Sequence, residues 1–301
     1  MPCYKPQKVY QRDDGRIVWA ERGSIRRSLT LPCGGCIGCR LEASRGWAVR
    51  CLHEAQMHEK NCFITLTYDE KYLPRHGSLD YGHFQRFAKR TRKALGNFRF
   101  YMSGEYGSLN GRPHYHACMF GLDFDDKEYL RLLPSGEKIY ESATLKKLWP
   151  FGYSSIGNVT FESAAYVARY ICKKITGDMA DTHYQRIDPE TGEVYYLEPE
   201  FGHMSLKPGI GATWFEKYGQ SDVIPFDRCV VRGMEQNTPR YYLELQKRRD
   251  KKNGTTESDW IEYERSKKAD LCREDSTEVR LRDREQVARA RLRFKKRGLE
   301  Y

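Results

Sequence analysis

Two histidines and one glutamate are the residues of this sequence best placed to do chemistry together. His114 and His116 stand two apart in Arg-Pro-His-Tyr-His-Ala-Cys, a segment typical of a β-strand. Side chains at i and i+2 of a strand share a face, so both imidazoles would project together and could bind a divalent metal. Without further residues, the pair could also be two solvated histidines on a polar face of the sheet.

Glu105 favours the metal interpretation. It lies near the end of a predicted strand at 98–106, and the turn-rich segment 107–113 predicts a hairpin to the histidine strand. In that hairpin Glu105 would lie opposite the histidine pair. One carboxylate and two imidazoles would make a three-point site with open positions for water or phosphate. An exposed hairpin charge is the alternative for Glu105.

Two tyrosines occupy a predicted helix at 162–175. Tyr166 and Tyr170 are four residues apart and therefore share a face, and Lys173 follows one turn later. A tyrosine hydroxyl can attack phosphorus and form a covalent phosphoester. Its ordinary pKa is about 10, so it needs help from a nearby cation or from a metal that polarises the phosphate. An aromatic helix face packed on a sheet is the other interpretation.

The elements that must position these residues predict an α+β fold. Strands are expected at 62–68, 98–106, 114–122 and 153–161, helices at 41–59, 84–95 and 162–175, and a hairpin at 184–197. This order indicates an antiparallel sheet with helices on one face.

The net charge and composition narrow the possible functions of the protein and suggest a division of the chain into three segments. The 301 residues carry 52 Lys and Arg against 41 Asp and Glu, a net charge of +11 that favours a nucleic-acid partner. No apolar run approaches ~18 residues and the first residues lack an apolar signal segment, so we expect no membrane partner. We divide the chain into a Cys-rich extension with its helix (1–60), a folded domain (61–240) and a charged, mostly helical tail (241–301).

Three cysteines form a tight run before the first predicted helix. The spacing Cys33-x-x-Cys36-x-x-Cys39 suits a structural Zn²⁺. A fourth ligand would come from outside the run: Cys3, Cys51 or His53. Free thiols at a loop-to-helix junction are the alternative, since a chain without a signal segment is expected in a reducing compartment.

Three motifs, taken in order, resemble the HUH rolling-circle replication initiators. They are the strand at 62–68, the His114-Tyr115-His116 strand with Glu105 upstream, and the helix with Tyr166 and Tyr170. The paired tyrosines resemble the two-tyrosine subclass, which includes the gene A-type initiators of small single-stranded DNA phages. The segments LPCGGCIGCRLEASRGWAVRC and NCFITLTYDEKYLP are similar to the replication initiators of gokushoviruses, a branch of the Microviridae. Tyr115 departs from the plainly apolar residue usual in the family, and we expect it to face the core.

The resemblance covers about residues 30–240 and implies an HUH endonuclease fold of the ferredoxin or RRM type. It implies a site-specific single-strand DNA nickase and strand transferase. By the resemblance, Mg²⁺ or Mn²⁺ would be held by Glu105, His114 and His116. The nucleophiles would be Tyr166 and Tyr170, with Lys173 assisting them.

The implied role is rolling-circle DNA replication in the host bacterial cytoplasm. The protein would bind the viral origin, keep the 5′ phosphate as a phosphotyrosine, and leave a 3′-OH for the host polymerase. A host helicase would separate the strands, and the second tyrosine would allow the displaced strand to be closed into a circle. Two alternatives remain at this point: a non-catalytic, zinc-stabilised DNA-binding regulator, and a relaxase or two-tyrosine transposase.

Overall fold

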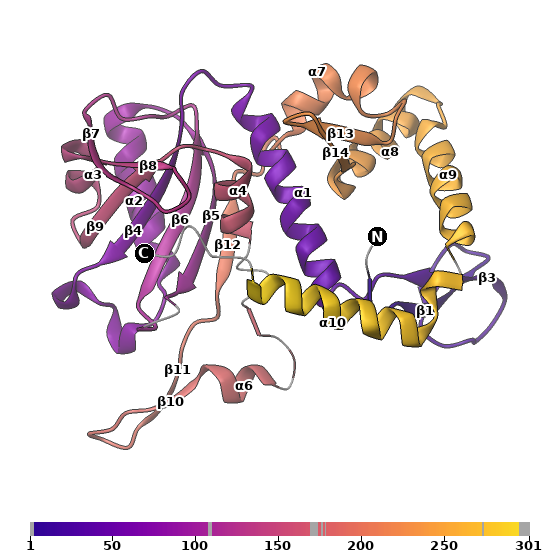
Figure 1. Ribbon diagram of the computed structural model, residues 1–301, viewed down its shortest axis with the longest axis horizontal. Helices are drawn as coiled ribbons and strands as arrows, with labels where there is room; N and C mark the ends of the chain where they lie inside the picture. The colour runs from indigo at the N-terminus through magenta and orange to yellow at the C-terminus, as the bar shows by residue number, and fades with distance from the viewer. Residues whose placement is uncertain are drawn as a thin grey trace. The chain divides into compact units, whose positions relative to one another are not determined.

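A seven-stranded antiparallel sheet carries the histidine pair and Glu105 in the computed structural model of the chain (Figure 1). In spatial order its strands are β12 (Phe201–Met204), β5 (Arg99–Tyr106), β6 (Pro113–Phe120), β4 (Asn61–Tyr68), β9 (Gly152–Gly157), β8 (Lys138–Ser142) and β7 (Lys127–Leu132). The structure describes residues 3–107, 110–168, 174–175, 177, 179–272 and 274–294. The predicted α+β class with an antiparallel sheet is confirmed.

The chain forms two compact units. The first comprises the described residues of 1–43 and 258–297, and the second comprises Ser44–Glu257, which contains the seven-stranded sheet. Three strands of the first unit pair in the order β2 (Ile17–Val18), β1 (Gln7–Arg12) and β3 (Ile25–Leu31). The boundaries at residues 60 and 240 remain predictions, and only the one at 240 rests on a change in charge composition.

The central strand β4 shows why both faces of the large sheet are covered. Its residues alternate, so that Ile64, Leu66 and Tyr68 face one core while Phe63 faces a second one. The first core is closed by α2 (Tyr81–Leu95) and α3 (Ala143–Leu148). The second is closed by α4 (Phe161–Ala168) and the part of α1 (Ile37–Ala55) that follows Ala43 (Figure 1). The sequence predicted these helices on one face of the sheet. This placement was wrong for α1 and α4, which match the helices expected at 41–59 and 162–175 and cover the other face.

Helix α4 begins at a reciprocal cap. The Thr160 backbone N–H donates to the Ser163 hydroxyl at 2.8 Å, and the Ser163 N–H donates to the Thr160 hydroxyl at 3.1 Å. The Ser44 hydroxyl of α1 donates to the Ala165 carbonyl at 3.0 Å. These contacts fix the start of the helix that carries Tyr166. The expected helix extended to residue 175, and residues 169–173 lie outside the described ones.

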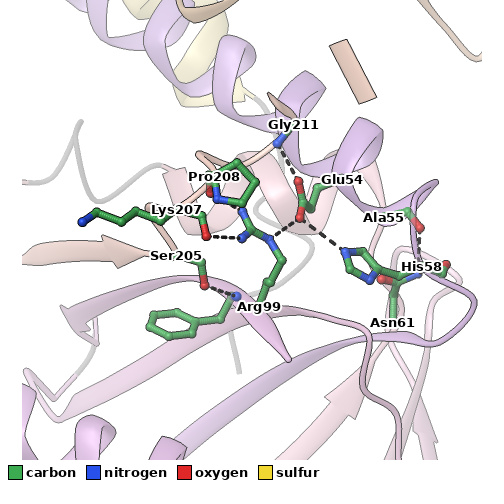
Figure 2. A network of polar contacts seen from close by, with 10 residues as sticks. Glu54, Ala55, His58, Asn61, Arg99, Ser205, Lys207, Pro208 and Gly211 are labelled. Carbon is green, nitrogen blue, oxygen red and sulfur yellow. Dashed lines mark hydrogen bonds and ion pairs between the residues drawn. The ribbon is translucent and has the colours of Figure 1, made fainter. Parts of the chain in front are cut away.

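A buried carboxylate joins the end of α1 to β5 and to the loop before α7 (Ala212–Asp222), as Figure 2 shows. Glu54 is 1 % exposed and accepts from Arg99 Nε at 2.5 Å and from the Gly211 N–H at 2.7 Å. His58 Nε2 lies 3.3 Å from the same carboxylate. The Arg99 guanidinium also donates to the Pro208 carbonyl. A single charged pair thus holds three segments of the second unit together.

The predicted short hairpin and the predicted helical tail are both present. The hairpin consists of β10 (Gln185–Ile187) and β11 (Val194–Tyr196), and the Asp188 side chain accepts two backbone N–H groups in its turn. The tail contains α8 (Arg240–Asn253), α9 (Glu257–Leu271) and α10 (Glu278–Phe294). The remaining elements are α6 (Met179–Tyr184), β13 (Arg228–Val231), β14 (Met234–Asn237), η1 (Glu70–Tyr72), η2 (Arg75–Gly77) and η3 (Glu274–Ser276).

Candidate active site

The β5–β6 hairpin brings the predicted carboxylate and imidazoles together. Glu105 is the register partner of His114, and Ser103 is the partner of His116. Glu105 Oε1 lies 3.9 Å from His114 Nε2 and 3.3 Å from His116 Nε2. One ligand atom from each of the three residues lies within 4.8 Å of the others. The arrangement that the hairpin predicted, with Glu105 opposite the pair, is the one observed.

The outer nitrogen of each imidazole has its own partner. His114 Nδ1 lies 3.0 Å from the Arg112 carbonyl oxygen, which can only accept, so Nδ1 carries the proton. His116 Nδ1 lies 3.0 Å from the Thr65 hydroxyl on β4. Both Nε2 atoms are therefore directed towards Glu105. Local sequence patterns do not identify Thr65, because its role depends on the pairing of Thr65 with His116 across β4 and β6.

The three side chains fit a divalent cation by their chemistry and spacing. Ligands about 2.1 Å from one ion are separated by about 3.0–4.2 Å, depending on the angle between them. The two measured separations, 3.3 and 3.9 Å, fall inside this range. One carboxylate with two imidazoles is a ligand set that accepts a transition metal and leaves coordination positions open. The site could therefore hold a metal ion.

The site is closed on one side and open on the other. Glu105 is fully buried and His116 is 1 % exposed, whereas the His114 side chain keeps 14 % of its surface exposed. Tyr115, between the histidines, faces the opposite core as expected. Its hydroxyl donates to the Asp80 carbonyl at 2.7 Å, and burial raises the pKa of this phenol to about 12. Tyr115 therefore belongs to the core and not to the site.

Tyr166 lies against the candidate site, on the same face of the sheet. Its ring centre is 4.8 Å from that of His116, and the two rings are nearly perpendicular. The tyrosine is 5 % exposed and comes from α4, which covers this face. Tyr170 and Lys173, the other two residues predicted to take part in catalysis, lie outside the described residues. The structure thus brings one of the two predicted phenols to the imidazoles.

A row of side chains extends from the site towards solvent. Thr67 of β4 is the register partner of both His114 and Tyr153, so these three residues share the face of the sheet. Tyr153 is 68 % exposed. An exposed aromatic ring one strand beyond β4 is a surface on which a nucleic-acid base can stack. The sequence predicted a strand at 153–161 but gave no sign of a function for Tyr153.

The cysteine run gains its fourth member from the beginning of the chain. Sulfur atoms of Cys3, Cys33, Cys36 and Cys39 lie within 4.8 Å of one another, so the group could hold a metal ion. Of the three residues left open as a fourth ligand, Cys3 is the one in the group. Cys51 and His53 belong to the other compact unit.

The described residues include no helix that is long and apolar enough to cross a membrane.

The chain resembles replication-associated proteins of phages. Residues 61–175 match the family "Replication-associated protein ORF2/G2P". The chain is 32% identical over 276 residues to replication-associated protein VP4 of Bdellovibrio phage phiMH2K, covering 88% of this chain and 81% of that protein. It is also 32% identical to replication-associated protein ORF2 of Spiroplasma virus 4, over 58% of this chain and 62% of that protein. For ORF4 of Chlamydia phage 1, the identity is 29% over 81% of this chain and 60% of the relative. No solved structure matches.

Proposed function

We propose a function from the premise that this chain belongs to the family of phage replication-associated proteins. In our proposal it initiates rolling-circle replication in the infected bacterium. It binds the viral origin, cuts one DNA strand there, and later rejoins the displaced strand. The observation that carries the proposal is the contact of Tyr166 with His116, one of two imidazoles gathered beside a buried carboxylate.

The chemistry proposed is a transesterification at phosphorus. The Tyr166 hydroxyl attacks the scissile phosphate, and the bond from the tyrosine oxygen to phosphorus forms as the bond to the 3′ oxygen breaks. The phenol gives up its proton and the departing 3′ oxygen gains one. The products are a 5′-phosphotyrosine and a free 3′-OH, which a polymerase of the host can extend. No water is consumed, so the energy of the phosphoester is kept for rejoining.

In this proposal Glu105, His114 and His116 hold Mg²⁺ or Mn²⁺. The bound cation would supply positive charge to the phosphate as negative charge accumulates in the transition state. The chain's own residues supply position. The Arg112 carbonyl and Thr65 orient the two imidazoles, and α4 holds the tyrosine at the edge of the ligand set.

Rejoining needs a second nucleophile, and Tyr170 is our proposal for it. After one round of replication, its hydroxyl would cut the regenerated origin. The 3′-OH released by this cut would attack the first phosphotyrosine, forming a phosphodiester and freeing the first phenol. Lys173 would stabilise charge on the phenolate or on the phosphate. A host helicase would separate the strands ahead of the polymerase.

The test is a nicking assay on a supercoiled plasmid that carries the viral origin. With Mg²⁺ or Mn²⁺ we expect a nicked circle whose 5′ end migrates with bound protein on a denaturing gel. A plasmid with a scrambled origin is the DNA control. A His114→Ala, His116→Ala variant should still retard origin DNA and should leave it uncut.

The nucleophile assignment needs its own variants. Tyr166→Phe and Tyr170→Phe, alone and together, remove only the attacking oxygens. The double variant should form no covalent adduct, while Tyr129→Phe, an exposed tyrosine on edge strand β7, should cut as the wild type does. An adduct formed by the double variant would overturn the assignment. Retarded but uncut DNA with the wild-type protein would instead favour a non-catalytic regulator.

A further inference from the structure

We propose that Cys3, Cys33, Cys36 and Cys39 bind one Zn²⁺, and that this ion holds the β1–β3 sheet to the beginning of α1. The site is separate from the proposed nicking chemistry in its residues and its ligand atoms. Cys3 precedes β1, Cys33 follows β3, and Cys39 lies in the first turn of α1. Gln7 at the start of β1 pairs with Leu31 at the end of β3, so Cys3 and Cys33 flank the same end of the sheet. One ion would therefore join this end of the sheet to the helix that follows it.

The sulfur spacing fits a tetrahedral ion. A zinc–sulfur distance of about 2.3 Å in a tetrahedron separates the sulfur atoms by about 3.8 Å. Cys3 Sγ and Cys36 Sγ lie 4.0 Å apart, and all four sulfur atoms lie within 4.8 Å of one another. The four cysteines are free, without a disulfide between any two of them. Each of the four sulfur atoms could therefore bind the ion separately.

Backbone donors already surround these sulfur atoms as they would surround metal-bound thiolates. The Cys33 N–H donates to Cys3 Sγ, the Cys36 N–H to Cys33 Sγ, and the Tyr4 N–H to Cys36 Sγ, each at 3.3 Å. Such donors offset the negative charge of a tetrathiolate centre. The turn between Cys33 and Cys36 needs Gly34, whose φ of +73° is rarely adopted by other residues.

Burial explains why this sheet would need a metal. Among residues 3–36, the buried side chains are Cys3, Cys36 and Val9. The other described residues of the same compact unit add only Ile261 and Leu281 as buried aliphatic side chains. Small structures with so little core depend on metals or disulfides. Cysteines instead form the centre of this region, with Tyr4 packed beside them. The free energy of zinc binding would thus be folding free energy for the N-terminal sheet.

Metal analysis of the full-length protein tests the proposal. We expect one zinc per chain after dialysis against a weak chelator. Cys3→Ser and Cys36→Ser should each lose it. Cys272→Ser, which removes an exposed thiol outside the cluster, should keep it, and so should the His114→Ala, His116→Ala variant. Zinc lost with the histidines but kept in Cys3→Ser would overturn the assignment.

Two measurements on wild-type protein avoid variants that fold poorly. Co²⁺ exchanged into the site should give intense thiolate-to-cobalt charge-transfer absorption and the visible bands of a tetrahedral ion. Trypsin should cut after Arg26 or Arg27 of β3 once the ion is removed, and this cleavage should be lost when Zn²⁺ is restored. Bound iron, no bound metal, or cleavage unchanged by zinc would each contradict the proposal. None of these measurements depends on nicking activity. The zinc proposal and the nicking proposal can therefore be refuted independently of each other.

Discussion

Replacing Thr65 with valine should weaken the metal site without touching a metal ligand. The Thr65 hydroxyl lies 3.0 Å from His116 Nδ1 and is the partner that directs Nε2 of this ring towards Glu105. Valine has nearly the shape of threonine and lacks the oxygen, so β4 should keep its packing. Thr65 is 5 % exposed, which leaves little room for a water molecule to replace the lost hydroxyl. With Nε2 bound to a metal, His116 Nδ1 would carry the proton, and in the variant this N–H would be buried without its present partner.

The known effect of such orienting partners gives the size of the change. Removing a partner that orients a metal-bound histidine typically lowers metal affinity by about 10- to 100-fold, which is about 1.4–2.8 kcal/mol. We therefore expect the Kd for Mn²⁺ to rise by at least about tenfold in Thr65→Val.

Thr67→Val is the matched control for this experiment. Thr67 lies two residues along the same strand and faces His114, but the Nδ1 of His114 bonds to the Arg112 carbonyl. Free Mn²⁺ measured by electron paramagnetic resonance gives the Kd for each variant, and the Mn²⁺ concentration for half-maximal nicking gives a second reading. An unchanged Kd in Thr65→Val, or an equal loss in Thr67→Val, would refute the role given to the hydroxyl.

Three further predictions concern DNA binding and stability. Tyr153→Ala should weaken binding of a single-stranded origin oligonucleotide by about 1–3 kcal/mol in fluorescence anisotropy, and Tyr153→Phe should bind normally, because stacking needs only the ring. Burial lowers the pKa of His53 from 6.5 to about 3, so below pH 6.5 the unfolded chain binds a proton that the folded one does not. From pH 7 to pH 5 the wild type should lose about 2 kcal/mol more than His53→Phe in urea unfolding. Glu54→Ala should lower the free energy of unfolding by about 3–5 kcal/mol, because it leaves Arg99 without its counter-charge, and an Arg99→Met, Glu54→Met pair should recover part of this loss.

Local sequence signals were enough to predict the hairpin that carries the proposed metal ligands. The turn-forming segment 107–113 fixed where β5 ends and β6 begins, and alternation then set which residues face each other. Glu105 and His114 could be paired for this reason, nine residues apart, before any tertiary contact was known. The position of Tyr115 in the opposite core followed from the same alternation.

Residues brought in by distant segments could not be predicted in the same way. Thr65 contacts His116 across 51 positions of sequence, and Cys3 joins the cysteine run across 30 or more. Their places depend on which strands become neighbours, which short-range patterns do not encode. For the same reason, the sequence did not show that helices cover both faces of the sheet. Ala48 and Cys51 of α1 are buried on the second face, and the position of α1 before β4 in the sequence does not indicate which face it covers.

One face of the sheet is closed near His116 and open near the hairpin turn, which would allow the proposed, buried ligand set to meet DNA. Along β6, Phe120 and His116 are covered and His114 is partly exposed, so burial decreases towards the hairpin turn. Helix α4 covers the closed part and delivers Tyr166 to its border, while Tyr153 stands in the open part. A phosphate that approached from the open part would meet His114 first. The closed part would keep His116 and Glu105 away from competing water, and so would strengthen their hold on a cation.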